Sequence, residues 1–184
     1  MPLLPGVKGA FGSEEYQLDR QATALKKAGD WDGAIAALQK RKAIMGWQWT
    51  DDKLAMYLQA AGRFDEAMAE IQWLLDNSHA WAVASFSHQP TSTLLKQRAT
   101  RRGQIHGAAA LICKRAKRAD LQAQHERLRD ACWDLREKIT PVAEADMKQR
   151  TRALNAASHV ERQALIAKRE AATARNRAMG DGKN

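Results

Sequence analysis

Cysteine and proline are both scarce in this sequence of 184 residues. Its two cysteines, Cys113 and Cys132, cannot supply the set of disulfides that stabilises small secreted domains, so we expect buried free thiols. Together with His125 they fit no zinc-ligand spacing, and no metal site is predicted. Proline occurs only at positions 2, 5, 90 and 141, which leaves long stretches open to helix formation.

Long apolar runs are missing as well. No segment approaches the roughly 20 apolar residues that a membrane-spanning helix needs. The N-terminal segment 1–12 lacks the basic start and unbroken apolar stretch of a secretory signal. We therefore expect a loose leader over 1–12, no membrane partner and a cytoplasmic location.

Patterns typical of β-strands are also absent, because no run alternates β-branched or aromatic residues with polar ones between turn signals. No glycine lies between Ala108 and Met179, and strong helix formers fill that stretch. The sequence thus predicts an all-α fold. Four positions are suited to begin helices: Ser13, Thr50, Pro90 and Thr140. We expect connecting loops over 44–49 and 77–89.

An internal repeat is present. The segment 28–38, AGDWDGAIAAL, matches 61–71, AGRFDEAMAEI, at an offset of 33. Both copies have a glycine suited to a helix end, an aromatic residue two positions later and an alanine three positions after that. A weaker third copy, 101–112, places Gly103 at the same relative position but has Ile105 instead of the aromatic residue.

This pattern resembles the tetratricopeptide repeat family over about residues 14–118. The family's closing proline is missing from all three copies. The resemblance implies a short α-solenoid of three helix pairs over 13–140, completed by a capping helix from about 119 to 139. A basic, alanine-rich helix or tail then follows over 141–184. The alternative is an ordinary helical bundle with an accidental repeat.

The charge is uneven. The chain has 30 basic and 21 acidic residues, and residues 94–129 alone carry a net charge of +8. Such a region attracts phosphates or an acidic protein surface. It lacks the interspersed aromatic residues that single-strand nucleic-acid binders use for base stacking.

Signatures of catalysis are missing. There is no glycine-rich phosphate loop, no Gly-x-Ser-x-Gly and no His-Glu-x-x-His. The carboxylate pairs fall at expected helix starts, where the helix dipole accounts for them. We predict a non-enzyme without a cofactor.

The resemblance favours a scaffold or adaptor that binds a peptide or partner protein in a helical groove, and the basic region 94–129 favours an acidic partner. One alternative is nucleic-acid association through 94–129. Another is a structural subunit of a bacterial or phage assembly, and self-association is also open. Trp47 and Trp49 lie in the expected loop 44–49, and Trp81 lies in the expected loop 77–89. These rings could either fill gaps between helices or contact a partner. The candidate partner contacts are Gln21, Leu25, Lys26, Trp47, Trp49, Tyr57, Gln59, Trp81, Leu95, Arg98, Arg101, Arg102, Arg115 and Arg118.

Overall fold

The computed structural model describes residues 13–156 and 159–181, so the leader expected over 1–12 lies outside the described residues. The elements are α1 (Glu14–Lys27), α2 (Trp31–Met45), the 3-10 turn η2 (Gly46–Gln48), α3 (Lys53–Ala60), α4 (Phe64–Phe86), α5 (Thr91–Arg115), α6 (Ala119–Ala156) and α7 (His159–Asp181). Within those ranges the chain forms helices and no strand, which confirms the all-α prediction. None of the described helices combines the length and the apolar character needed to cross a membrane.

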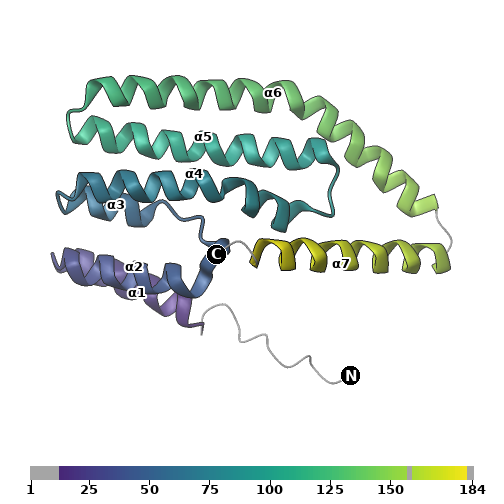
Figure 1. The fold of residues 1–184 in the computed structure, drawn as a ribbon, viewed down its shortest axis with the longest axis horizontal. Coiled ribbons are helices and arrows are strands. Elements are labelled where there is room, and N and C mark those ends of the chain that lie inside the picture. Colours follow the sequence, from purple (N-terminus) through teal and green to yellow (C-terminus); the bar gives the residue numbers. More distant parts are fainter. Residues whose placement is uncertain (1–12, 157–158, 182–184) are drawn as a thin grey trace.

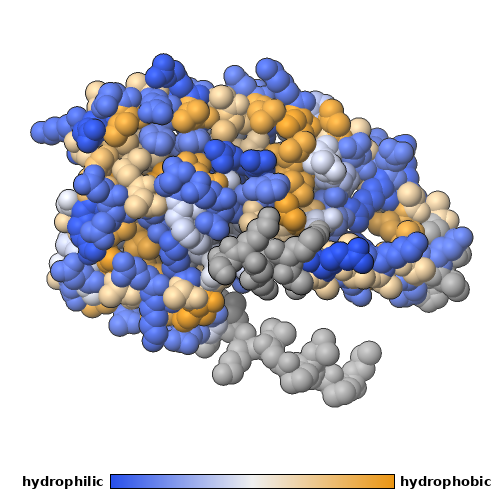
Figure 2. Space-filling model, viewed as in Figure 1, coloured by the Kyte–Doolittle hydropathy of each residue, from blue (hydrophilic) through white to orange (hydrophobic). Residues whose placement is uncertain are grey.

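Helices that follow one another in the chain pack side by side. α1 pairs with α2, α3 with α4 and α5 with α6, and further contacts of α2 with α3 and of α4 with α5 join these hairpins. Figure 1 shows the resulting stack, from α1 and α2 at one edge to α6 at the other. α7 turns back and packs against α4. On the face shown in Figure 2, hydrophilic residues prevail and hydrophobic ones lie in small groups between them.

The three hairpins share one turn geometry. Gly29 and Gly62 have φ values of 82° and 80°, the left-handed conformation predicted for a residue just past a helix end. In both turns the following N–H donates to the carbonyl five residues earlier, which closes a Schellman motif. The turn between α5 and α6 has the same closure, but Lys117 holds the central position with φ 57°.

The third copy of the repeat is therefore not where the sequence indicates it. α5 runs through Gly103 without a break, so the turn expected there is wrong. A Cβ at Gly103 would lie 3.1 Å from the ring of Trp133, which belongs to α6. Gly103 therefore allows α5 and α6 to approach each other closely. A lone sequence cannot separate that role from a turn, since both need a residue without a side chain.

Two other helix boundaries differ from the prediction. Thr50 does not cap a helix, because α3 begins at Lys53, whose N–H donates to the carboxylate of Asp51 over 2.9 Å. Thr140 and Pro141 lie inside α6, so the capping helix does not end at 139. Figure 1 shows α6 changing direction along its length, and proline is a common cause of such a kink.

The expected loop over 77–89 is also mostly helix, since α4 continues to Phe86. Only a short connection then leads to α5, which begins directly after Pro90 as predicted. Ser13 caps α1 through its side chain, again as predicted. The long helix expected from 141 onward is divided between the end of α6 and α7.

The hydrophobic core lies between α1, α2, α3, α4 and α5. The repeat alanines Ala34 and Ala67 are fully buried, which lets paired helices approach closely. Trp31 meets Tyr57 edge-on, with ring centres 5.8 Å apart, and so joins the first hairpin to the second. The largest fully buried side chains are Trp49, Ile35, Leu38, Ile71, Ile105, Ile112 and Cys113.

Candidate functional site

A network of charged side chains ties the first three helices together. The Nη1 atom of Arg41 lies 3.1 Å from Asp19 Oδ1 and 2.8 Å from Asp51 Oδ2. Lys53 Nζ lies 2.9 Å from the same oxygen of Asp19. Two cations and two anions are thus balanced in a partly buried setting, where the pairs are screened less than at an exposed surface. This network holds the three helices in position, and its positive and negative charges neutralise one another.

A second polar contact is more deeply buried. Glu70 is 7% exposed and accepts hydrogen bonds from Trp49 Nε1 over 2.9 Å and from Lys42 Nζ over 2.6 Å. Lys42 Nζ also lies 3.8 Å from the centre of the Trp73 ring. Trp49 is 1% exposed, so it is a core residue and offers no surface to a partner. The sequence left that choice open, because nothing in it shows that a carboxylate faces the indole N–H.

Five of the candidate partner contacts lie on α1 and α3. Gln21 and Lys26 are exposed, while Leu25 and Gln59 are partly buried. Tyr57 is 5% exposed, and Lys26 Nζ lies 5.1 Å from the centre of its ring. α1 and α3 therefore bring Lys26 and Tyr57 together, although the phenol ring is mostly covered.

The other two candidate tryptophans are partly buried. Trp47 lies in η2, and Trp81 lies on α4. Trp81 meets Phe86 edge-on with ring centres 5.5 Å apart. Both tryptophans are distant in sequence from Lys26 and Tyr57, which meet between α1 and α3. Trp81 lies in a segment that was expected to be a loop but belongs to α4.

The candidate arginines of α5 have different surroundings. Arg102 Nη1 donates to the carbonyl of Leu75 over 3.2 Å and lies 3.4 Å from Ser78 Oγ, so it joins α5 to α4. Burial lowers the pKa of Arg101, against the opposing pull of the Asp52 and Asp51 carboxylates. Leu95 is 41% exposed and Arg98 is partly buried. Charge reversal at Arg101 or Arg102 would therefore disturb helix packing as well as any partner.

The remaining candidates, Arg115 and Arg118, lie in what we call the basic turn: Lys114, Arg115, Lys117 and Arg118. All four side chains are exposed at the junction of α5 and α6. The guanidinium of Arg118 lies 5.6 Å from the centre of the Phe64 ring, so this turn lies beside the turn between α3 and α4. Among the described residues, its one ion pair joins Arg118 to Asp120 at 3.9 Å.

A histidine pair joins α5 to α6, and the sequence did not reveal it. The Nδ1 atoms of His106 and His125 lie 3.1 Å apart, and His106 is 4% exposed. Burial lowers the pKa of His106 to about 4, and the nearby charges of His125 and Arg102 act in the same direction. Burial also lowers the pKa of His125. The lowered pKa of each histidine favours the neutral ring, and an Nδ1–H of one ring can donate to the Nδ1 of the other.

The pair does not extend into a metal centre. Among the described residues, no group of three or more His, Cys, Asp or Glu side chains is placed to hold an ion. In α6, Leu121, His125, Leu128 and Cys132 recur at steps of four and three residues, a heptad spacing that places His125 on one face of the helix. His125 contacts α5 from that face, whereas the position of His106 follows only from the close contact of the two helices.

Comparison with known proteins gives no assignment: no protein-family model, no curated protein and no solved structure matches this chain.

Proposed function

We propose that this chain is a tetratricopeptide-like scaffold that binds an acidic segment of a partner protein. The observation that carries the proposal is the repetition of one turn geometry in three successive hairpins. Stacked hairpins of this kind are typical of proteins that bind extended partners along a continuous surface.

The turns form a row at one end of the molecule, at the left in Figure 1. Arg63, in the second turn, lies 3.5 Å from Asp32 at the start of α2. Arg118, in the third turn, contacts Phe64 at the start of α4. Because the basic turn ends this row, positive potential is concentrated at one end of the stack, where it would attract an acidic segment.

The first helices of the hairpins supply the adjoining surface. α3 contacts α5, and the side chains of Lys26 and Tyr57 join α1 to α3. These first helices, α1, α3 and α5, form a second row beside the turns. Its exposed side chains include Gln21 and Lys26 on α1 and Leu95 on α5. A partner segment could follow the row from the basic turn with polar and apolar contacts to each first helix.

The test measures binding of a labelled Glu/Asp-rich peptide by fluorescence anisotropy, with the matching Gln/Asn peptide as the neutral reference. We expect the double variant Arg115→Glu/Arg118→Glu to weaken binding of the acidic peptide at least about tenfold, as loss of two charge contacts implies. The control, Lys148→Glu/Arg152→Glu, makes the same charge change at two exposed positions of α6. Equal losses in both variants, or equal binding of the neutral peptide, would reject a specific acidic-segment site.

The basic turn also supports nucleic acid as a second candidate partner, because four exposed cations lie together there with Asp120 as their nearby described acid. Duplex DNA and single-stranded RNA titrated across a salt series distinguish the two. Affinity that falls steeply with salt and disappears in Arg115→Glu/Arg118→Glu, without binding of the acidic peptide, would replace the scaffold proposal.

A further inference from the structure

A hollow lies between the end of α6 and α7, away from the basic turn. α7 packs against α4, and a pocket of about 360 Å³ separates it from α6. We call it the α6–α7 pocket. Leu154 of α6 and Leu165 and Ile166 of α7 line it. Leu165 is 45% exposed and Ile166 is 36% exposed, although paired helices normally bury such side chains against each other.

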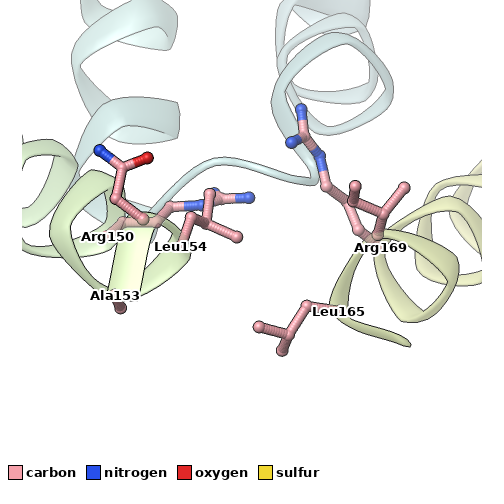
Figure 3. A pocket seen from close by; sticks show the side chains of 7 residues that line it. Arg150, Ala153, Leu154, Leu165 and Arg169 are labelled. Carbon is pink, nitrogen blue, oxygen red and sulfur yellow. The ribbon is translucent and has the colours of Figure 1, made fainter. Parts of the chain in front are cut away.

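Two arginines enter the same pocket from opposite helices. Arg150 lies on α6 and Arg169 on α7, and Figure 3 shows the two residues on opposite sides of the space between these helices. An adjoining pocket of about 550 Å³ shares Arg169 and is lined by His88 and Glu170 as well. Arg169 thus lines both pockets, together with Arg150 in the first and with His88 in the second.

The positive charges around this hollow influence one another. Burial lowers the pKa of Arg150, and the charge of Arg169 lowers it further. Burial also lowers the pKa of His88, and both arginines add to that effect. Asp146, one helical turn before Arg150, accepts a hydrogen bond from Ser92 and so ties α6 to α5. Among the described residues, no ion pair links an acid to Arg150 or Arg169.

An anion placed between the two guanidinium groups would relieve their repulsion. A guanidinium matches a carboxylate or phosphate with two parallel hydrogen bonds, and such charge-assisted bonds are among the stronger ones in proteins. The leucine and isoleucine side chains favour an apolar body attached to that anionic group. A volume of about 360 Å³ is within the range of small-molecule sites and leaves no room for a helix or a duplex.

We propose that the α6–α7 pocket binds a small organic anion. Its carboxylate or phosphate group lies between Arg150 and Arg169, and its apolar body lies against Leu154, Leu165 and Ile166. This site is separate from the basic turn, so its test does not depend on the proposed scaffold function.

The test titrates the full chain with octanoate, octyl phosphate, 1-octanol and inorganic phosphate by isothermal calorimetry. We expect octanoate or octyl phosphate to bind at least tenfold more tightly than both 1-octanol and inorganic phosphate, because only the first two combine an anion with an apolar body. The stronger of the two anions identifies the head group as carboxylate or phosphate. If 1-octanol binds equally well, or neither anion binds, the proposal is wrong.

Matched variants locate the site. Arg150→Gln/Arg169→Gln should weaken the preferred anion at least tenfold, whereas the control Arg152→Gln/Lys168→Gln removes two exposed charges from the same helices and should change affinity less than twofold. Leu165→Asn, at a 45% exposed position, should also weaken octanoate or octyl phosphate while leaving the thermal midpoint unchanged. Equal effects of the arginine pair and the control pair would overturn the assignment.

Discussion

Lys117 adopts the left-handed backbone conformation that glycine adopts in the two preceding turns. A residue with a Cβ atom pays about 1 kcal/mol for this conformation, whereas glycine does not. The sequence predicts the turns at Gly29 and Gly62 because glycine marks them. It cannot predict the turn at Lys117, since lysine is an ordinary helix residue and only the tertiary arrangement holds it there.

Replacing that lysine should therefore stabilise the protein. We expect Lys117→Gly to raise the free energy of unfolding by about 0.5–1 kcal/mol, measured by urea denaturation. The control is Lys114→Gly, in the last turn of α5, which should lower it by up to about 1 kcal/mol because glycine is a poor helix former. A loss of stability in Lys117→Gly would contradict the proposed strain.

The histidine pair makes stability depend on pH. An unfolded histidine takes up a proton near pH 6.5, whereas folded His106 does so only near pH 4, so the unfolded state binds more protons between these values. Acidification from pH 7 to pH 5 should therefore lower the free energy of unfolding, by about 2 kcal/mol for this group.

Denaturant titrations at several pH values check this expectation. His106→Asn should flatten the dependence over that range, because the asparagine does not titrate. The control variant, His79→Asn, replaces a histidine at an exposed position of α4. The interpretation fails if both variants give the same pH profile.

At the scale of elements, the contact between α5 and α6 explains why replacing two glycines of α5 is expected to change stability in opposite directions. A Cβ at Gly103 would lie 3.1 Å from the Trp133 ring, closer than side chains normally approach. A Cβ at Gly107 would meet only the Arg129 side chain, at an ordinary distance of 3.7 Å. The sequence suggested a turn at Gly103 and could not distinguish the two glycines, because the Trp133 ring that separates their roles belongs to another element.

Alanine at these two positions separates packing from helix propensity. Gly103→Ala should lower the free energy of unfolding by about 1–2 kcal/mol through overpacking, despite the better helix propensity of alanine. Gly107→Ala should raise it by up to about 1 kcal/mol. Thermal and urea denaturation of both variants measure the difference, and stabilisation by both would mean that α5 and α6 are not in close contact at Gly103.

For the whole molecule, the sequence predicts the helical class and two of the three turns, since helix formers and the repeat are local properties. It misses the cationic α6–α7 pocket and the histidine pair because each joins residues that are far apart in the chain. The helix start predicted at Thr140 is also wrong, because Thr140 lies inside α6. Pro141 continues the helix there, and Ala143 is buried two residues later.

Truncation tests how stability is distributed. The hydrophobic core is formed by α1 to α5, so a chain ending after Ala156 should unfold cooperatively within about 4 °C of the full chain, followed by circular dichroism. A chain ending after Thr140 should melt lower, because it loses buried Ala143 and the hydrogen bond between Ser92 and Asp146. Non-cooperative melting of the first truncation would show that α7 is essential to the fold.

The stacking of hairpins also determines how the protein opens. Among the described helices, the first hairpin packs against the second, through contacts such as that between Lys42 and Glu70. Opening that end therefore breaks a single layer of contacts, while opening the middle breaks two. Amide protons of α1 and α2 should exchange with solvent sooner than those of α4, so that a gradient of local opening runs through a molecule built from similar units.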